Sequence, residues 1–437
     1  PLALSPNRAY TCKKQGGCCK KARPIRPKAD SYLSESEEEA MRFLITPNNL
    51  RADALQYART LAQTLRSGGH TPYVLQETAA CPGWQAAPVW DGRAPLDMLL
   101  IVGGCDNGKP CGGLLAPDAQ KVLAGFDLTL PRDVLADPQI FAVKTIDIPT
   151  KKIRYYSRMY LNMDRAKFDR WLLSLIPDSV DRINGRCRHI EKSGGEFTVT
   201  FRSEASVHTV RCRRIVGADG ANSIVRRTFF PCDIMHYVAI QQWFDSDKIK
   251  RSSHNEKALI NVFNPFYSCI FDPETSESCS WSINKDNYFI YGGSFAPEKC
   301  RAMFESQKQR FEKLMGVQLG KPLRTEACKV LRPRKLTDFQ TGGEDIFLIG
   351  EAAGFISPSS FEGISSAMKS GRLLAAAFRS GSPQLTYRRS VRGIKLRLYL
   401  KCFKRYFMYT PFLRRLVMDS GATSIKVEER KKPYGKA

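Results

Sequence analysis

Residues 341–364, TGGEDIFLIGEAAGFISPSSFEGI, contain the arrangement of residues with the clearest chemistry in the chain. A short apolar run at 345–349, typical of a buried strand, leads into Gly350 and Glu351, and a helix is predicted to begin at 362–364. Glycine lets the backbone approach a ligand closely, and a carboxylate accepts hydrogen bonds from sugar hydroxyls. The helix start offers free N–H groups to an anion or a carbonyl. This order of elements suits a flat, phosphorylated cofactor; an ordinary strand–turn–helix corner is the alternative.

A second stretch, residues 211–227, repeats the pattern with the sequence RCRRIVGADGANSIVRR. A predicted strand at 214–216 ends in small residues, and Asp219-Gly220 then forms a tight turn. Asn222 and Ser223 are suited to cap the helix that follows. About the length of an inserted substrate domain separates the two stretches.

Together the two stretches resemble the downstream FAD fingerprints of the flavoprotein hydroxylase class, and most strongly its geranylgeranyl reductase branch. The resemblance spans about residues 108–425, and Glu351 stands where the class usually has Asp. The first fingerprint matches at Asp219, Gly220, Ser223 and Arg226, and the second at Gly350, Ala352, Ala353, Pro358 and Gly363. Further matching segments are 109–113, 162–165, 168–169, Trp281 and 285–286.

The resemblance implies FAD as cofactor, with NAD(P)H as a candidate reductant. Cys111 is expected beside the flavin ring, although an inert buried thiol is the other interpretation. No metal site is expected, because the five His residues lack ligand spacing. The expected cofactor contacts are Cys111, Gly112, Gly113, Arg165, Asp219, Gly220, Ser223, Gly350, Glu351, Ala352, Ala353, Pro358, Glu362, Gly363 and Ile364.

The beginning of the chain departs from that class. Members open with a βαβ unit carrying G-x-G-x-x-G, and no such motif precedes Lys109. Residues 41–104 are predicted to form strand, helix and strand, with a glycine-free turn at 46–51, and they resemble the opening of an NAD kinase. The kinase motif is interrupted around Asp106, which is better interpreted as a solvated turn residue. The chain is therefore interpreted as a composite; alternatively, this unit docks in place of the missing one, with Glu77 at the ribose-binding end of its second strand.

The expected fold is α/β: a Rossmann-like FAD-binding domain with an atypical or incomplete first βαβ unit, an inserted antiparallel-sheet substrate domain and C-terminal helices. The expected parts are a disordered extension 1–40, a kinase-like segment 41–104, FAD-binding regions 105–227 and 341–385, a substrate sheet 228–340 and a basic helical region 386–437. Within the substrate sheet, strands are predicted at 237–244, 258–263, 267–271, 280–284 and 288–295, and a helix at 300–315.

Charge and cysteine content limit the partners. The net charge is +25, and residues 388–437 carry 15 Lys or Arg against 3 Asp or Glu. In that region Leu396, Leu400, Phe403 and Phe407 form one helical stripe among basic residues. The stripe either packs on the body of the protein or lies on an anionic membrane surface. The 14 scattered Cys indicate a reducing cytoplasm, and no nucleic-acid-binding module or membrane-spanning run is visible.

The leading function is an FAD-dependent oxidoreductase that reduces C=C bonds of a hydrophobic, isoprenoid-like substrate. Candidate substrate-lining residues are Trp243, Trp281 and Phe295, with sheet-core aromatics as the alternative. Three other functions stay open: a flavin-dependent monooxygenase, a composite chain impaired by loss of the glycine-rich turn, and a nucleotide binder related to NAD kinases.

Overall fold

The computed structural model describes residues 111–427, apart from 178–179, 181, 204–205 and 253–257, and four earlier segments, 42–45, 66–67, 71–74 and 96–102. Several predictions therefore fall outside the described residues, namely those for 1–40, 46–51, the helix within 54–65, Glu77 and Asp106. Two predicted strands at the start are present: β1 (Arg42–Ile45) and β2 (Thr71–Val74) pair in parallel.

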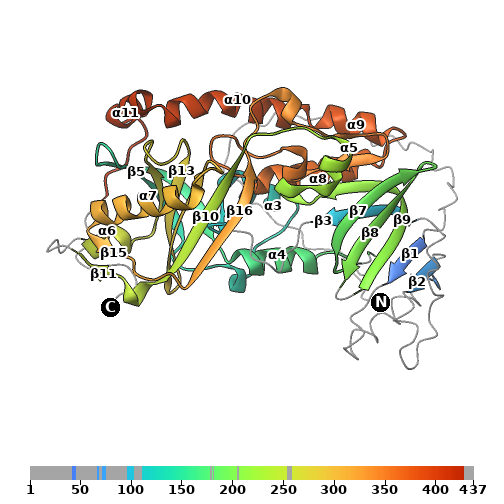
Figure 1. Ribbon diagram of the computed structural model, residues 1–437, viewed down its shortest axis with the longest axis horizontal. Coiled ribbons are helices and arrows are strands. Elements are labelled where there is room, and N and C mark those ends of the chain that lie inside the picture. Colours follow the sequence, from blue (N-terminus) through green and yellow to red (C-terminus); the bar gives the residue numbers. More distant parts are fainter. Residues whose placement is uncertain are drawn as a thin grey trace, which may run out of the picture. The chain divides into compact units, whose positions relative to one another are not determined.

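The first large sheet holds both fingerprint strands side by side (Figure 1). Its central strand, β9 (Ser206–Ala218), pairs in parallel with β3 (Leu96–Val102) and with β18 (Ile346–Leu348). The first half of β9 continues an antiparallel meander with β7 (Arg186–Ser193) and β8 (Glu196–Ser203), and β17 (Gly342–Gly343) closes the other edge. Parallel strands bring their carboxyl ends to one edge of the sheet, which is where ligands bind in open α/β sheets.

Three helices complete this half. They are α5 (Ile224–Phe229), α8 (Ile364–Ala377) and α9 (Pro383–Ser390). One apolar core joins them to the sheet, because Val225, Leu374 and Tyr387 are buried with Ile215 and Leu348. The fold class predicted from the sequence, an α/β FAD-binding domain with a second sheet, is confirmed.

The second sheet has eight strands in the order β16-β10-β14-β13-β12-β5-β6-β4, mostly antiparallel. It reaches beyond the expected 228–340, because three of its strands come from residues 114–162. The strands are β4 (Leu114–Leu115), β5 (Ile140–Asp147), β6 (Lys152–Asn162), β10 (His236–Asp245), β12 (Phe266–Phe271), β13 (Cys279–Lys285), β14 (Tyr288–Phe295) and β16 (Arg324–Leu331). Short connecting elements are α3 (Pro117–Ala124), α4 (Arg165–Ser174) and the strand pair β11 (Lys250–Arg251) and β15 (Val317–Gln318).

One strand prediction in this sheet is wrong. Residues 258–263 were expected to extend, but α6 is a helix at Ala258–Val262. Ala258 and Val262 lie one helical turn apart and are both buried, so a helix places both side chains in the core. Asn264 then ends the turn, because its Nδ2 donates to the carbonyl of Asn261 at 2.8 Å. The helix predicted at 300–315 is present as α7 (Cys300–Met315).

Helix α7 covers one face of the second sheet. Its Phe304 and Phe311 are buried against Tyr291 and Phe295, and Phe295 meets Phe304 edge-on with ring centroids 5.9 Å apart. Phe295 is wholly buried in this core. It is therefore a packing residue on the helix-covered face, which corrects its assignment as a candidate substrate-lining residue.

Lys144 of β5 is a buried cation, and its burial makes the stability of the protein depend on pH. Its Nζ donates to the carbonyl of Asn261 at 2.9 Å, and burial lowers its pKa from 10.5 to about 8. The folded protein therefore binds this proton more weakly than the unfolded chain. The resulting cost, about 3 kcal/mol, is complete below about pH 8 and disappears as the pH rises toward 10.5.

We therefore expect Lys144→Met to change the pH dependence of stability. Relative to the variant, the wild-type protein should gain about 2–3 kcal/mol in free energy of unfolding between about pH 7 and about pH 10. Urea unfolding of both proteins across this range measures the difference. The comparison cancels the titration of other groups, so a constant difference would contradict an electrostatic cost at Lys144.

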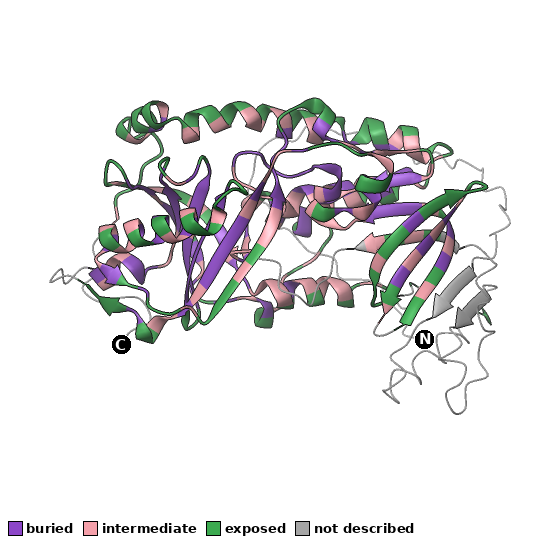
Figure 2. Cartoon of the chain, in the orientation of Figure 1, coloured by how far each residue is buried: buried purple, intermediate pink, exposed green. Residues whose placement is uncertain are grey.

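The C-terminal helices α10 (Arg392–Tyr409) and α11 (Pro411–Asp419) lie along the outside of the described fold (Figure 1). Leu398 is buried, Cys402 Sγ contacts the carbonyl of Pro333, and Tyr409 packs on Phe271. The stripe of Leu396, Leu400, Phe403 and Phe407 lies on the other side and is exposed. Figure 2 shows this outer side in green. The prediction that the stripe packs on the body of the protein is therefore wrong, because a different face of α10 makes those contacts.

None of the described helices is both long and apolar enough to span a bilayer.

Candidate functional site

The two fingerprint turns meet at the carboxyl ends of β9 and β18. A 3-10 turn, η2 (Gly220–Asn222), follows β9, and another, η5 (Gly350–Ala353), follows β18. Ile349 N donates to the carbonyl of Gly217 at 3.0 Å, which joins the two strand ends. Arg226 crosses between the turns, because its Nη1 donates to the carbonyl of Ala352 at 3.0 Å. The turns near Asp219 and Glu351 are therefore adjacent in the fold.

Asp219 has one satisfied and one unsatisfied oxygen. Its Oδ2 accepts from Ile224 N at 2.6 Å, while Oδ1 is buried and has no hydrogen-bond partner among the described residues. Burial raises the pKa of this carboxyl group. Ser223 caps α5 as predicted, since its Oγ accepts from Arg226 N at 3.0 Å. The free Oδ1 is therefore a ready acceptor for a ligand hydroxyl.

The second turn is built for close packing against α8. Gly350 has φ +56°, and a Cβ there would stand 3.2 Å from Ala367 Cβ. Its N–H donates to Ser370 Oγ at 2.9 Å, so backbone and helix are joined directly. Glu351 Oε1 accepts from Leu331 N at 3.0 Å and ties this turn to β16 of the second sheet. The Glu in place of the usual Asp thus links the two sheets.

The start of α8 offers backbone rather than side-chain groups. Gly363 is the N-cap residue and supplies no side-chain cap, so the first N–H groups of α8 have no side-chain acceptor there. The carboxylate of Glu362 is held elsewhere, by Tyr160 Oη at 2.9 Å and Arg158 Nη2 at 3.2 Å. Pro358 is buried and lines a cleft beside α10. The carboxylate of Glu362 is therefore engaged with β6.

The Cys111–Gly113 loop is fixed by Lys285. Lys285 Nζ donates to Asn162 Oδ1 at 2.7 Å and to the carbonyl oxygens of Met163 and Gly113. Met163 N donates to the carbonyl of Gly113 at 2.8 Å. Burial lowers the pKa of Lys285 to about 8. Neither the lysine nor its amide partner was recognised from sequence as a site residue.

Arg165 is a second cation that interacts electrostatically with Cys111. Arg165, at the start of α4, donates through Nε to Asp169 Oδ1 at 2.8 Å. Burial alone would lower its pKa, but Cys111 and Asp169 together raise it. Cys111 also interacts with Lys285 electrostatically. Arg165 and Lys285 therefore both interact with the Cys111 thiol, and the carboxylates of Asp169, Asp164 and Asp286 belong to the same surroundings.

The loop, the turns and the second sheet share two apolar clusters. Ile364 and Met368 of α8 pack on the cluster that contains Leu115 and Met163. The other cluster joins Trp281 to Ala221 of the first turn and to Ile356 and Phe361 of the second. A Cβ on Gly112 would stand 3.9 Å from the Trp281 ring. The predicted segments at 111–113, 219–223 and 350–364 therefore lie around one location with Trp281.

Unlike Phe295, Trp281 and Trp243 are not part of the core beneath α7. The Trp281 Nε1 is buried and has no hydrogen-bond partner among the described residues. Trp243 Nε1 donates to Glu326 Oε2 at 3.2 Å, and Gln241 Nε2 donates to the same oxygen at 2.6 Å and to the carbonyl of Cys111 at 3.5 Å. This polar network, also missed from sequence, connects the Cys111 loop to the open face of the second sheet.

These residues fit FAD. Parallel strand ends, small-residue turns, an uncapped helix start and an unpaired Asp219 oxygen are the groups that bind a dinucleotide of this kind. The segment expected to meet the pyrophosphate, 46–51, lies outside the described residues. The NAD-kinase-like character of 41–104 stays a prediction.

Comparisons with known proteins agree with this site. Residues 184–385, which contain both turns, match the FAD binding domain family model. A geranylgeranyl bacteriochlorophyll reductase-like protein from Thermoplasma acidophilum has the same fold, with TM-score 0.58, 14% identity, and coverage of 87% of this chain and 91% of that one. Klebsiella pneumoniae HpxO, solved with FAD and uric acid, has TM-score 0.51 at 14% identity over 87% of this chain and 92% of its own.

Fold and site thus define an FAD-binding protein of the FAD-dependent oxidoreductase class. Protein CbrA from Escherichia coli strain CFT073 is 44% identical over 321 residues, which are 72% of this chain and 84% of that protein. CbrA of strain K12 is 43% identical and covered to 86%. The chain belongs to the CbrA family.

Proposed function

We propose that this protein reduces C=C bonds of a hydrophobic, isoprenoid-like substrate. The observations that support the proposal are the fixed Cys111–Gly113 loop beside Trp281 and the electrostatic interactions of the Cys111 thiol with Arg165 and Lys285. When bound and reduced, FAD would supply the hydride. Reduction of a C=C bond also needs a proton, and a thiol beside two cations can release one.

In this scheme each residue has one task. Cys111 Sγ delivers a proton to the alkene carbon that does not receive the hydride, and the thiolate that remains is stabilised by Arg165 and Lys285 until solvent reprotonates it. Asn162 holds Lys285 in place through the 2.7 Å hydrogen bond. Trp281 excludes water from the reacting carbons. The Gln241–Glu326 network offers polar groups that orient the substrate.

The decisive experiment is anaerobic. Purified protein is titrated with FAD, reduced with dithionite, mixed with geranylgeranyl diphosphate and followed by flavin absorbance and product mass. We expect reoxidation without oxygen and a product that has gained two hydrogens. Reoxidation that requires oxygen and adds an oxygen atom would show a flavin-dependent monooxygenase, the alternative that the sequence leaves open. A protein that stays colourless after reconstitution would contradict both enzyme functions.

Changing Cys111 tests the proton donor. We expect Cys111→Ala to lower turnover about 100-fold, the usual contribution of one acid, while FAD affinity stays within about twofold. The matched control is Cys300→Ala, because Cys300 is a half-buried thiol at the start of α7, outside the residues expected at the site. A merely structural role for Cys111 would weaken FAD binding along with turnover. Equal turnover of Cys111→Ala and the wild-type protein would exclude the thiol as donor.

A further inference from the structure

The outer face of the C-terminal helices is unusually apolar. On α10 the exposed fractions are 57% for Leu396, 56% for Leu400, 54% for Phe403 and 55% for Phe407. These residues recur at intervals of four and three, so they form one continuous stripe. On α11, Phe412, Leu416 and Val417 are also 67%, 52% and 48% exposed. Contiguous exposed apolar surface of this kind indicates an interaction site.

The stripe is not needed to attach α10 to the protein. Leu398, Cys402 and Tyr409 on its inner face already make that attachment, and Tyr409 Oη donates to the carbonyl of Ser359. Arg414 of α11 is likewise buried and paired with Asp147. The helices are therefore anchored by one set of residues and present a second apolar set outward.

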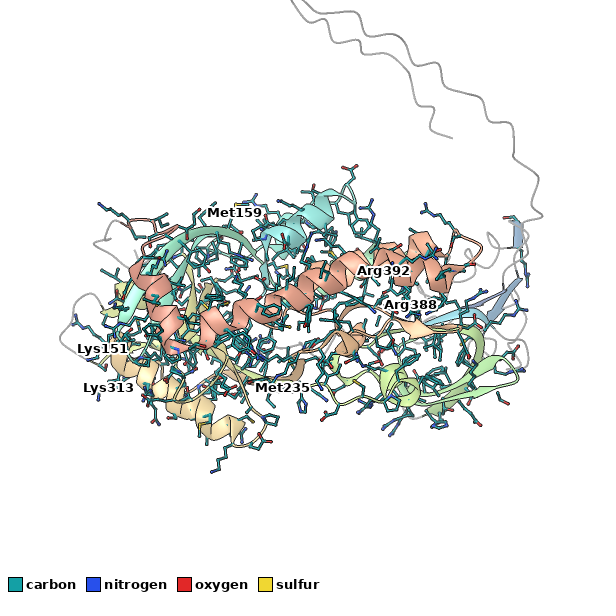
Figure 3. All side chains as sticks on the ribbon, turned by 90° about the horizontal axis from the view of Figure 1, so that it is seen from above. Lys151, Met159, Met235, Lys313, Arg388 and Arg392 are labelled. Atoms are coloured by element: carbon teal, nitrogen blue, oxygen red, sulfur yellow. The ribbon has the colours of Figure 1, made fainter. Side chains whose placement is uncertain are left out.

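Positive charge borders the stripe. Helix α10 contains six Lys or Arg and no Asp or Glu. Arg397 and Lys404 are exposed and lie next to the stripe on the same helix, and Arg388 and Arg392 lie where α9 meets α10 (Figure 3). An apolar stripe bordered by cations is typical of helices that lie in the interface of an anionic bilayer.

A cleft beside α10 adds a place for a headgroup. It has a volume of about 330 Å³, and its apolar walls include Tyr399, Phe403 and Tyr406. Arg334 and Arg405 stand in the same lining, so two guanidinium groups accompany the apolar walls. Guanidinium groups bind phosphate oxygens with good geometry.

We propose that the outer faces of α10 and α11 are a docking surface for an anionic phospholipid bilayer. The Phe and Leu side chains enter the acyl boundary, the flanking cations meet lipid phosphates, and the cleft receives a headgroup. A second copy of the chain fits less well, because two such surfaces face to face would oppose cation to cation. The proposal stands on these helices alone and does not depend on the reaction catalysed.

Vesicle flotation tests it with the full chain. Vesicles of phosphatidylcholine containing phosphatidylglycerol should carry the wild-type protein, vesicles of phosphatidylcholine alone should not, and high salt should weaken binding. We expect Phe403→Ser/Phe407→Ser to lower partitioning at least about tenfold. Its control is Val207→Ser/Leu323→Ser, which changes residues 66% and 56% exposed outside α10 and α11 and should bind normally.

Charge reversal gives an independent variant. Arg397→Glu/Lys404→Glu should lower partitioning at least about tenfold, whereas Lys313→Glu/Lys321→Glu, at exposed positions outside both helices, should not. Absence of wild-type binding to anionic vesicles, or equal binding by both stripe and charge variants, would overturn the proposal. Light scattering that shows a dimer lost in Phe403→Ser/Phe407→Ser would also overturn it, with a second copy as the occupant.

Discussion

Replacing Gly113 with alanine is expected to weaken FAD binding at least about 30-fold, equivalent to about 2 kcal/mol. Gly113 has φ +65°, where an L-residue costs about 1–2 kcal/mol. A Cβ there would lie 2.2 Å from the carbonyl oxygen of Met163 and 2.7 Å from Lys285 Nζ. Because the first neighbour is backbone, the loop itself must move, and with it the thiol and cations around the proposed flavin site.

The neighbouring glycine provides a matched control. A Cβ on Gly112 would meet Ile283 Cδ1 at 2.5 Å, which is the far end of a flexible side chain, and its φ is not in the left-handed region. Gly112→Ala should therefore change FAD affinity by less than about threefold. Flavin fluorescence titration gives both dissociation constants, and circular dichroism confirms that both variants fold. Equal affinities would show that the loop conformation does not control FAD binding.

Local patterns made the fingerprint turns predictable. The strand–turn–helix sequences near Asp219 and Gly350 contain their own glycines, caps and apolar runs, so the elements form where the sequence places them. Helix α7 was predicted with its boundaries for the same reason, because apolar residues at helical spacing mark both of its ends, at Met303 and Phe304 and at Phe311, Leu314 and Met315. The segment 258–263 failed because five of its six residues are apolar, so the pattern shows no clear period and buries equally well as strand or helix.

Contacts between distant strands could not be predicted in this way. Lys285 and Asn162 are separated by 123 residues, and only the strand order of the second sheet brings them together. The Gln241–Glu326 pair depends on the register between β10 and β16, which sets these two residues directly opposite one another. Apart from the family resemblance of 162–165 and 285–286, a lysine that closes a strand of alternating polar and apolar residues was the local signal available. It indicates that acceptors lie nearby but not which residues provide them.

The C-terminal stripe shows a related limit. Periodicity identified the residues on one side of α10, but a helix with apolar residues on two sides gives no local sign of which side packs. Tertiary contacts decide this, since Leu398 and Tyr409 have partners on the fold whereas Phe403 and Phe407 are exposed. Arg414 of α11 adds a buried ion pair with Asp147 to these inner contacts.

Replacing Arg414 with methionine is expected to destabilise the protein by about 3–5 kcal/mol. The guanidinium is buried, with Nη2 at 2.7 Å and Nε at 2.8 Å from Asp147 Oδ1, and Nη1 donates to the carbonyl of Met408 at 3.0 Å. It also lies over the Phe271 ring, 5.0 Å from the centroid. Methionine fills a similar volume but leaves the Asp147 carboxylate buried without its cation, and that uncompensated charge is the main cost.

Arg415, the next residue, provides a control, because it carries the same charge on an exposed side chain. Its side chain is 62% exposed and its Nε lies 3.7 Å from Asp419, so Arg415→Met should cost less than about 0.5 kcal/mol. Adding Asp147→Asn to Arg414→Met should recover part of the loss, because it removes the stranded charge. Urea unfolding of the four proteins measures these differences. If Arg414→Met costs no more than Arg415→Met, the pair does not anchor α11, and the orientation of the outward stripe must be set by other contacts of α10.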